Sequence, residues 1–343
     1  MQPDRRVPMH RHRIELADIA AWDNLLLAVW KAARGKRQRP DVACFLSDLD
    51  GRLQCLAEDI LLGSVPYGRY RSFHIHDPKQ RLIHAACFED RVLHHAIMNL
   101  AEPVFERGLV PATFACRPGK GVHRAVIQVQ QNLRRFPWFV KVDVDGYFPS
   151  IDHRLLFELL QRRFKGSDFL CLLWRIIDSY HATVGKGLPI GSLTSQHFAN
   201  HYLNGADRFL QNDPQVCAMV RYMDDIIWWC ADKTTAKQTL AKLLEYMEGQ
   251  LSLQIKPTTQ TNRSARGVTY CGFRILPGTV RLTPRKKYRY RVLRDKWEAA
   301  WLDGKIDSRT LQQAYAAVHA ITLHTDSRSW RQRNLQLHPS RVI

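Results

Sequence analysis

The chain has 343 residues and carries 51 Lys and Arg against 32 Asp and Glu, a formal net charge of +19. This excess is far larger than solubility requires, and it indicates a polyanionic partner such as nucleic acid. No apolar stretch approaches the ~20 residues that span a bilayer, and the apolar run 25–30 follows Asp18 and Asp23 too closely for a secretory signal. We therefore expect a cytoplasmic, intracellular protein with no membrane partner.

The cysteine and histidine patterns do not predict a metal site. The 8 Cys show neither C-x-x-C nor mixed Cys/His ligand spacing, so we expect reduced and mostly buried thiols. None of the 15 His has a persuasive partner in the sequence. His94, His95 and His197 fall in helical stretches, where a structural imidazole is the expected role.

Apolar periodicity predicts helices in the first third of the chain. Helices are expected over 15–33 and 40–62, with a basic connector at 31–39. That connector is as consistent with a solvated loop as with a direct RNA contact. A further helix is expected over 88–105, where Pro103 should stop it.

Residues 138–145 alternate in the period-two pattern of a strand with one buried and one polar face. The apolar positions are Trp138, Val140, Val142 and Val144. Asp143 and Asp145 lie on the polar face together with Lys141. Asp143 therefore leaves its strand on the polar side.

Two adjacent carboxylates, Asp224 and Asp225, lie between the apolar runs 218–220 and 226–230. This arrangement predicts a hairpin with acids at its tip, and such a turn by itself is more simply a solvated Asp-rich turn. Together with Asp143, however, three carboxylates would repel. A pair of anions about 4 Å apart in an effective dielectric of roughly 20 is unfavourable by about 4 kcal/mol. Two bridging Mg²⁺ ions would remove the repulsion and form a clamp for in-line phosphoryl transfer.

The last 63 residues form a basic segment. Residues 281–343 contain 14 Lys and Arg against 5 Asp and Glu, a net charge of +9. Cations alternate with aromatic side chains here, as on a surface that follows a nucleic-acid backbone. The cations that we expect to contact nucleic acid are Arg285, Lys286, Lys287, Arg289 and Arg291.

Five ordered blocks in this chain resemble those of reverse transcriptases. They are residues 77–92, 142–152, 187–196, 222–225 and 270–275. The similarity covers roughly residues 70–280 and implies an α/β (α+β) right-hand polymerase. The resemblance implies a helical N-terminal extension (1–70), fingers and palm (71–280) and a basic helical thumb (281–343).

The resemblance also implies residue roles in metal binding. Asp143, Asp224 and Asp225 would be catalytic and hold two Mg²⁺, which Mn²⁺ could replace. The backbone carbonyl of Val144 would complete one coordination sphere. Asp145 is not required by the family pattern, so we expect it to be solvated or paired with Lys141. Lys256 is a weaker candidate, as the proton donor to the pyrophosphate leaving group.

The nucleotide-binding roles are also implied by the resemblance. Lys79 and Arg81 would neutralise the triphosphate, and Phe148 would be the steric gate that excludes a ribose 2′-hydroxyl. Tyr147 is expected to pack in the core. A helix expected over 193–210 starts after Gly191, so that its N-terminus can face the nucleotide. The pocket residues implied are Ile190, Gly191, Ser195 and Gln196, and those of the primer grip are Gly272 and Phe273.

The block 187–196 is the one that resembles the nucleotide-pocket segment of the family, and we call it the pocket block. Within the family, it is most similar to that of the reverse transcriptases of diversity-generating retroelements. Ile190 stands where most relatives have Gln, and Gln196 where they have Pro. This branch implies a bacterial or phage-encoded enzyme that makes error-prone, adenine-mutagenic cDNA for diversification of a target gene. Its partners would be a template RNA, the RNA/cDNA duplex, dNTPs and a small basic accessory protein, the accessory variability determinant, which is expected to be oligomeric.

Two alternatives remain open at the level of sequence. One is a group II intron-like or retron-like reverse transcriptase of ordinary fidelity. The other is a polymerase-derived RNA-binding or defence protein whose chemistry is vestigial. The intact acidic triad and Phe148 argue against the second alternative.

Overall fold

The computed structural model describes residues 11–76 and 80–342. The chain divides into two compact units, each assembled from separate segments. The first contains the described residues up to Cys116, together with Asp143–Phe209 and Lys242–Pro257. The second contains Arg117–Val142, Leu210–Ala241 and the chain from Thr258 onward. Both units mix helices and strands, which confirms the predicted α/β class. The division into 1–70, 71–280 and 281–343 stays a prediction.

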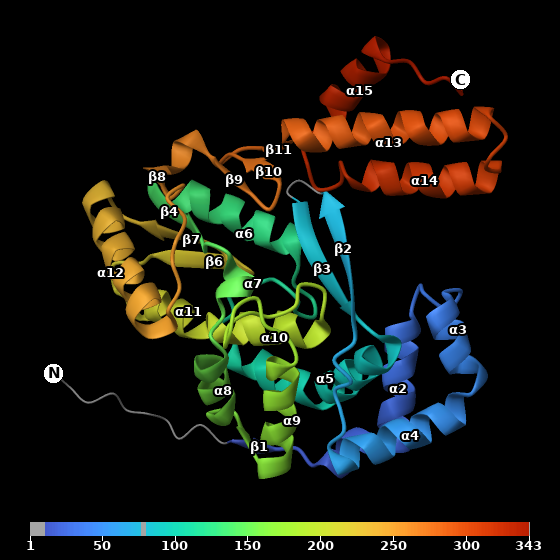
Figure 1. The fold of residues 1–343 in the computed structure, drawn as a ribbon. Helices are drawn as coiled ribbons and strands as arrows, with labels where there is room; N and C mark the ends of the chain where they lie inside the picture. The colour runs from blue at the N-terminus through green and yellow to red at the C-terminus, as the bar shows by residue number, and fades with distance from the viewer. Residues whose placement is uncertain (1–10, 77–79, 343) are drawn as a thin grey trace. The chain divides into compact units, whose positions relative to one another are not determined.

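The first unit begins with a helical layer that packs on a long helix (Figure 1). The layer consists of α1 (Leu16–Ala20), α2 (Trp22–Ala33), α3 (Pro40–Ser47) and α4 (Leu49–Leu62), and the long helix is α5 (Phe88–Gly108). Ahead of them, β1 (His12–Arg13) pairs in parallel with β5 (Phe164–Lys165). The packing of α2 against α5 buries residues such as Leu25 and Ile97 completely. Helices in this region were predicted, but their division into four was not.

Helix α5 does not stop at Pro103, so that part of the sequence prediction is wrong. A proline inside a helix costs about 3 kcal/mol or more, because it lacks a backbone N–H and its ring clashes with the preceding turn. Here Ala101, Val104 and Phe105 are all buried on either side of it. Packing of this continuous apolar face offsets the local cost.

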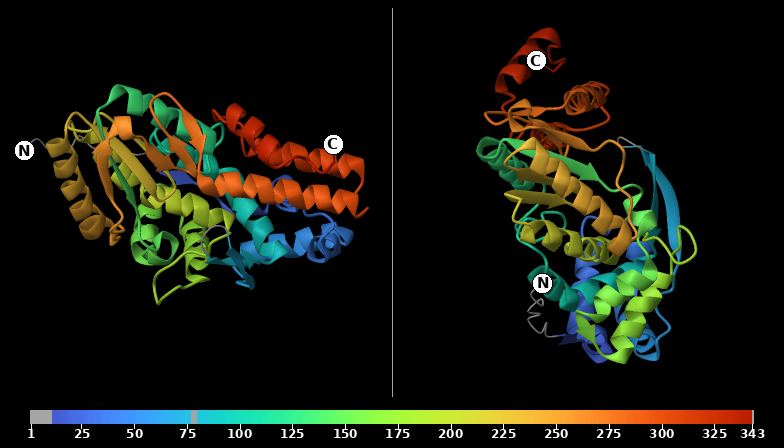
Figure 2. Two further views of the ribbon diagram at one scale, coloured as in Figure 1. Left: turned by 90° about the horizontal axis from the view of Figure 1, so that it is seen from above. Right: turned by 90° about the vertical axis from the view of Figure 1, so that its left-hand side faces the viewer.

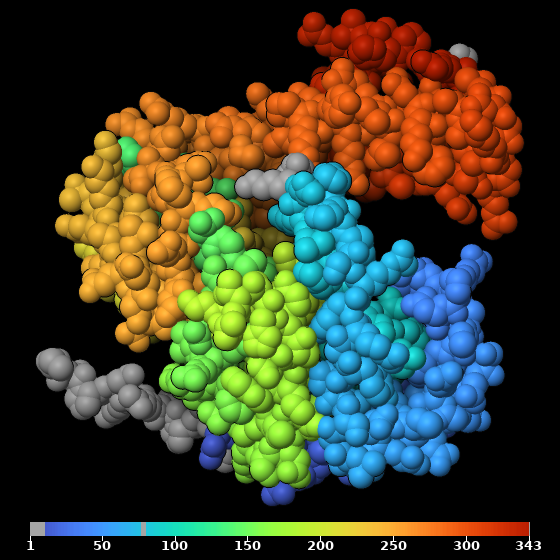
Figure 3. Space-filling view, viewed as in Figure 1, coloured from blue at the N-terminus to red at the C-terminus, as the bar shows by residue number. Residues whose placement is uncertain are grey.

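A β-hairpin follows the N-terminal helices in the first unit, formed by β2 (Tyr70–His76) and β3 (Gln80–Ala86). Figure 3 shows the helices in blue adjoining the hairpin in cyan on one face of this unit. Most side chains of β2 are exposed, so the hairpin presents surface on both faces. Only its base, at Ala86, is buried.

The remainder of the first unit is helical. Its helices are α7 (Tyr147–Ser150), α8 (His153–Gln161), α9 (Ser167–Asp178) and α10 (Leu193–Tyr202). Helix α11 (Asn204–Asn212) continues into the second unit, and α12 (Lys233–Leu251) begins in the second unit and ends in the first. The single helix expected over 193–210 is therefore two helices that meet at Leu203. The side chain of Asn204 donates to the carbonyl of Gly108 at 3.1 Å at this break.

The second unit contains a four-stranded sheet in the order β6 (Ala218–Tyr222), β7 (Asp225–Cys230), β4 (Trp138–Asp143), β8 (Gln260–Arg263). Helix α6 (Val122–Arg135) packs against β6 in this unit (Figure 1). Val140, Val220, Ile227 and Trp228 are fully buried. The alternation predicted for 138–145 is confirmed only in part, because Val140, Val142 and Val144 are buried but Phe139 is fully buried as well and Trp138 only partly, and the strand ends at Asp143.

A three-stranded sheet and a helical segment complete the second unit. The sheet has the order β11 (Val280–Leu282), β10 (Phe273–Ile275), β9 (Val268–Tyr270), and a 3₁₀ turn, Ser264–Arg266, precedes β9. The terminal helices are α13 (Pro284–Leu302), α14 (Ser308–Ala320) and α15 (Arg328–Leu337). Helices α13 and α14 run side by side (Figure 2). Among the described residues, no helix has the length and apolar character needed to cross a membrane.

The cysteines correct one further expectation. Cys44, Cys55, Cys116, Cys171 and Cys217 are exposed, and Cys230 is the buried one. All eight are free thiols, as predicted, but they are not mostly buried. The helical cysteines Cys44, Cys55 and Cys171 lie on outward faces of amphipathic helices, a placement that composition cannot reveal.

Candidate active site

Strands β6 and β7 meet in a two-residue turn that carries the paired acids. Tyr222 lies opposite Asp225 in the register, so Met223 and Asp224 form the turn. Met223 has φ of 57°, a left-handed conformation that costs a non-glycine residue energy and favours tight hairpins. The buried guanidinium of Arg221 donates to the carbonyl of Met223 at 2.9 Å. This bond holds the turn in a conformation that the local sequence does not favour.

Asp225 is held by two neighbours within the second unit. The Lys141 ammonium lies 3.3 Å from its carboxylate. The hydroxyl of Tyr270 donates to the Asp225 carbonyl at 2.8 Å. Burial raises the pKa of Tyr270 well above its ordinary value, so this hydroxyl stays protonated as a donor. Asp145, in contrast, is exposed at the end of the predicted strand, which agrees with the solvated role expected for it.

Asp143 is held within the first unit by the segment that precedes Pro257. The ammonium of Lys256 contacts the Asp143 carboxylate, and the Lys256 amide donates to the Asp143 carbonyl at 2.9 Å. The Asp145 amide donates to Gln254 at 2.8 Å. Val144, between them, is fully buried, and neither bond uses its carbonyl. Val144 is thus fixed by hydrogen bonds on both sides.

These residues fit a site for hard divalent cations. Carboxylates and a backbone carbonyl offer only oxygen ligands, which Mg²⁺ prefers. Asp143 and Asp225 are each matched with a lysine, Lys256 and Lys141 respectively. An ammonium beside a carboxylate supplies the positive charge that a bound cation would otherwise provide. The chemistry of the donor set is therefore compatible with the predicted magnesium ions.

Within the first unit, the block 187–196 is joined to the β2–β3 hairpin. The His84 amide donates to the Ile190 carbonyl at 3.0 Å. Gly191 has φ of 115°, and a Cβ placed there would lie 3.0 Å from the Ile83 side chain. Both constraints require glycine at this position. Arg81 is exposed on β3, and Lys79 lies outside the described residues.

Phe148 and the residues around it connect α7 to the pocket block. The Leu188 amide donates to the Phe148 carbonyl at 2.9 Å. Phe148 is partly exposed, whereas Tyr147 is buried with its hydroxyl donating to the Ala199 carbonyl. The structural role predicted for Tyr147 is confirmed. The proposed gate role of Phe148 stays a prediction.

The start of α10 is more enclosed than the sequence suggests. Ser195 is only 2% exposed, while Gln196 is partly exposed and accepts a bond from the Cys116 thiol at 3.3 Å. Ser192 contacts Nδ1 of His94 at 3.1 Å. Burial lowers the pKa of His94 to about 4, so it is neutral at pH 7 and has the structural role expected.

The block 270–275 contains a second two-residue turn, at Cys271 and Gly272, between β9 and β10. Both residues have positive φ, 48° and 75°, as a type I′ turn requires. Thr283 donates to the Gly272 carbonyl at 3.2 Å. The Lys286 ammonium lies 3.1 Å from the centre of the Phe273 ring, a cation–π contact. Burial, reinforced by Arg289 and Arg285, lowers the pKa of Lys286 to about 8.

Helix α13 presents only part of its charge to solvent. Arg285 and Arg289 are exposed, whereas Lys286, Lys287 and Arg291 are partly covered. Arg294, further along, is 2% exposed and pairs with the buried Glu298. Because Arg294 is buried and paired with Glu298 inside the fold, it does not belong to a nucleic-acid surface.

Sequence reasoning missed three supporting residues, namely Lys141 as the partner of Asp225, Arg221 and Tyr270. The sequence pattern predicts Lys141 only as a partner for Asp145. For Lys141 the available signal was a cation two residues before Asp143, on the same face of the predicted strand. For Arg221 the signal was a charge inside an apolar strand. Tyr270 gave no comparable signal.

Known proteins of one family are similar to this chain in sequence. The profile of the family described as "Reverse transcriptase (RNA-dependent DNA polymerase)" matches residues 75–275. Protein YkfC of Escherichia coli (strain K12) is 29% identical over 173 residues, covering 46% of this chain and 45% of that protein. Group II intron-encoded protein LtrA of Lactococcus lactis subsp. cremoris is 25% identical over 212 residues, covering 56% of this chain and 35% of that protein.

The apo telomerase of Candida tropicalis superposes with a TM-score of 0.46 at 12% identity, covering 69% of this chain and 53% of that one. The chain spans less than half the length of the two curated relatives above. The family profile, in contrast, covers more than half of this chain. The chain therefore belongs to the reverse transcriptase (RNA-dependent DNA polymerase) family.

Proposed function

We propose that the protein is an RNA-directed DNA polymerase in which Asp143, Asp224 and Asp225 hold two Mg²⁺ ions. One observation carries the proposal. Strand β4 ends at Asp143, and β7, which begins at Asp225, is its neighbour in the order of the sheet. The family to which the chain belongs supports the same chemistry.

The lysine contacts of Asp143 and Asp225 support this role. The bound ions would activate the attacking primer hydroxyl and stabilise the pyrophosphate leaving group. Asp143 and Asp224 would hold both ions, with Asp225 as the less direct ligand. Cation binding at Asp143 would release the Lys256 ammonium from that carboxylate, freeing a proton donor. The Val144 carbonyl would complete one coordination sphere.

Substrate selection would rest on the pocket block and the hairpin joined to it. Arg81, with Lys79, would bind the triphosphate. Ile190 and Gly191 would line the base pair, and Phe148 would exclude the ribose 2′-hydroxyl. The hydrogen bond between His84 and Ile190 supports a pocket shared by the two segments. Ser195 and Gln196 would support the pocket from α10.

The template–primer duplex would bind through the second unit. Gly272 and Phe273, at the tight turn, would contact the primer end. The cations of α13 would contact backbone phosphates, and these are Arg285, Lys286, Lys287, Arg289 and Arg291. The positive φ of Gly272 and the exposure of Arg285 and Arg289 support this assignment.

Primer extension with purified protein tests the catalytic assignment. With an RNA template, a DNA primer, dNTPs and Mg²⁺, Asp143→Asn and Asp224→Asn should each lower the rate at least about 10³-fold, since several kcal/mol of transition-state stabilisation depends on the ions. Asp145→Asn is the matched control, because Asp145 is exposed near the end of the same strand. Its rate should stay within about twofold of wild type. Near-normal extension by Asp224→Asn would refute the assignment.

We further propose that the enzyme belongs to the diversity-generating branch and copies adenine with errors. The pocket sequence carries this proposal, through Ile190 and Gln196. An amide at position 190 can hydrogen-bond near the nascent pair, whereas Ile only packs, so selectivity should fall. Template RNA and a small basic accessory protein would then be partners. The alternative is an enzyme of ordinary fidelity, which the similarity to LtrA of Lactococcus lactis favours.

Sequencing cDNA made from an RNA that contains all four bases separates these two alternatives. Wild type should misincorporate mainly opposite adenine, and Ile190→Gln should lower adenine errors several-fold more than the other errors. An unchanged adenine error rate in the variant would mean that Ile190 does not cause the infidelity. Accurate copying of adenine by wild type, with template RNA and accessory protein present, would refute the branch.

A further inference from the structure

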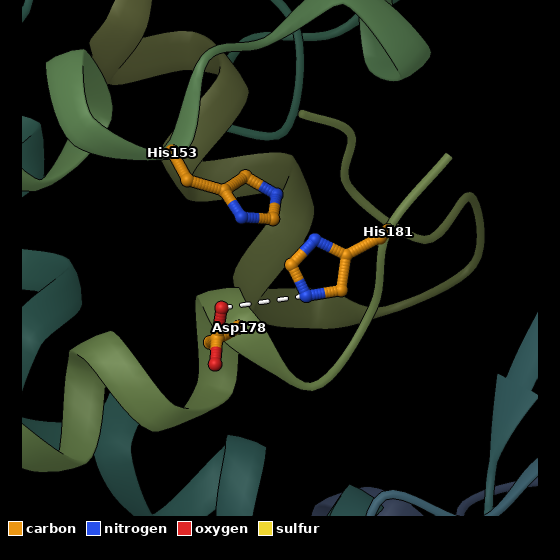
Figure 4. Close-up of side chains that lie close together, drawn as sticks. All are labelled: His153, Asp178 and His181. Atoms are coloured by element: carbon orange, nitrogen blue, oxygen red, sulfur yellow. Dashed lines mark ion pairs between the residues drawn. The ribbon is translucent and has the colours of Figure 1, made fainter. Parts of the chain in front are cut away.

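Three metal-binding side chains converge in the first unit, outside every residue given a role above. They are His153 at the start of α8, Asp178 at the end of α9, and His181 just after it (Figure 4). One ligand atom from each lies within 4.8 Å of the others. His153 lies 25 or more positions before the other two in the chain, so their proximity is a product of the fold.

His153 is preorganised as a ligand. Its side chain is 1% exposed, and its Nε2 lies 2.7 Å from the Gly187 carbonyl, which can only accept a proton. The ring therefore carries its proton on Nε2 and a lone pair on Nδ1. In the described part of the chain this buried Nδ1 has no hydrogen-bond partner. A histidine whose other nitrogen is fixed by a carbonyl is the usual arrangement around a bound metal ion.

Asp178 and His181 supply the remaining ligands. Nε2 of His181 lies 3.3 Å from the Asp178 carboxylate, and the centroids of the His153 and His181 rings are 4.9 Å apart. Asp178 is the last residue of α9, where the helix dipole also favours a cation. Two imidazoles and one carboxylate suit Zn²⁺, whereas Mg²⁺ prefers a shell made only of oxygen.

We propose that His153, Asp178 and His181 form a Zn²⁺ site with a fourth position open to water. Ligand atoms at about 2.0–2.1 Å from a tetrahedral zinc lie about 3.3 Å apart, so the cluster must contract. Asp178 and His181 are exposed and can make this movement. Coordination through Nε2 of His181 places its proton on Nδ1, which breaks the 3.3 Å bond from the Gly185 amide. The loop readjusts at Gly185.

The site would fasten the loop that leads into the nucleotide pocket block. The His153 amide donates to Gly185 at 3.0 Å, and the Gly187 amide donates to Ile151 at 2.8 Å. Leu188 follows immediately and is bonded to Phe148. A metal ion on His153 and His181 would therefore tie both ends of the loop to α8. Its role would be structural, separate from the catalytic ions.

Zinc binding to the full chain tests the proposal, with excess Mg²⁺ present so that the oxygen-only site is occupied. Isothermal titration with Zn²⁺ should show one site that Asp178→Asn and His181→Gln each weaken at least about tenfold. His338→Gln, an exposed histidine elsewhere, is the matched control and should bind as wild type does. Both test substitutions are at exposed positions, so misfolding is not expected.

Two further readouts distinguish a built site from scattered binding by surface thiols. Co²⁺ should give the visible absorption of a low-coordinate, nitrogen-ligated ion in wild type and His338→Gln but not in the test variants. Zn²⁺ should also slow amide exchange over residues 181–187. The proposal fails if wild type binds no Zn²⁺, if all variants bind equally, or if exchange in this loop does not change. In those cases His181 and Asp178 form only a hydrogen-bonded pair.

Discussion

The second unit contains two hairpins with two-residue turns, and the two turns present opposite charges. The β6–β7 turn carries Asp224 beside the strained Met223, whereas the β9–β10 turn uses Gly272 and lies against the lysine of α13. The first turn is fixed by a buried cation, Arg221. The second turn pairs Gly272 with a non-glycine residue of positive φ, Cys271, and Thr283 donates to the Gly272 carbonyl. Both turns therefore combine one non-glycine residue of positive φ with a side-chain hydrogen bond to the turn, and they differ in the sign of the charge beside them, Asp224 in the first and Lys286 in the second.

The largest contrast is expected in nucleic-acid binding. The double substitution Arg285→Ala and Arg289→Ala should weaken binding of an RNA/DNA duplex by tenfold or more and reduce the slope of log affinity against log salt by about 2, because each phosphate contact releases about one counterion. Asp224→Asn should leave both quantities unchanged. Affinities measured at several salt concentrations give the answer.

Arg52→Ala is the control for that experiment, since Arg52 is exposed on α4 and lies 3.7 Å from Asp48. It should not alter the salt slope. If the double variant bound as wild type does, α13 would not be the nucleic-acid surface. Weaker binding by Asp224→Asn would instead show that the acidic turn contributes to affinity.

A smaller effect on duplex affinity is expected from a change of pH, through Lys286 beside the β9–β10 turn. Lys286 has its pKa lowered to about 8, so it is charged below pH 8 and loses its charge as pH rises through that value. Duplex affinity should fall several-fold between pH 7 and 9 in wild type. The neighbouring groups do not produce this change. Arg285 and Arg289 stay charged, burial raises the pKa of the Cys271 thiol, and burial lowers the pKa of His123, so both are neutral at pH 7.

Lys286→Arg separates Lys286 from other sources of pH dependence, because arginine stays charged throughout this range. Fluorescence anisotropy at fixed ionic strength should show a flat profile for this variant between pH 7 and 9. A slope equal to that of wild type would assign the titration to another group. The charge of Lys286 should favour duplex binding but lower the stability of the folded protein. Because its folded pKa lies below the unfolded value of 10.5, its contribution to stability increases from pH 8 to 10.5.

The smallest effects are expected on folding, and they should have opposite signs at the two turns. Gly272→Ala should lower the free energy of unfolding by about 1 kcal/mol, since φ is positive and the new Cβ would lie 3.1 Å from Lys286. Met223→Gly should raise it by up to about 1 kcal/mol by relieving strain. Urea unfolding measures both. Destabilisation by Met223→Gly would show that its side-chain packing outweighs the backbone cost.

Several features of this protein could be predicted from the sequence alone, because they depend on residues close together in the chain. The alternation at 138–143 and the paired acids at 224–225 identified a strand and a hairpin. Period-two burial and turn preference are local properties, so they can be read from sequence. The order of the blocks predicted the family, which the profile confirmed.

Tertiary structure decided the partners and the burial of those residues. Lys256 reaches Asp143 from 113 positions away, and no local pattern records that contact. Arg294 belongs to a basic run but is buried, and α5 continues through Pro103, because packing of distant apolar surface outweighs local preference. His153 and His181 are each unremarkable in sequence. Only the fold brings His153, whose buried Nδ1 has no hydrogen-bond partner, close to the ring of His181, because this proximity depends on how α8 and α9 pack.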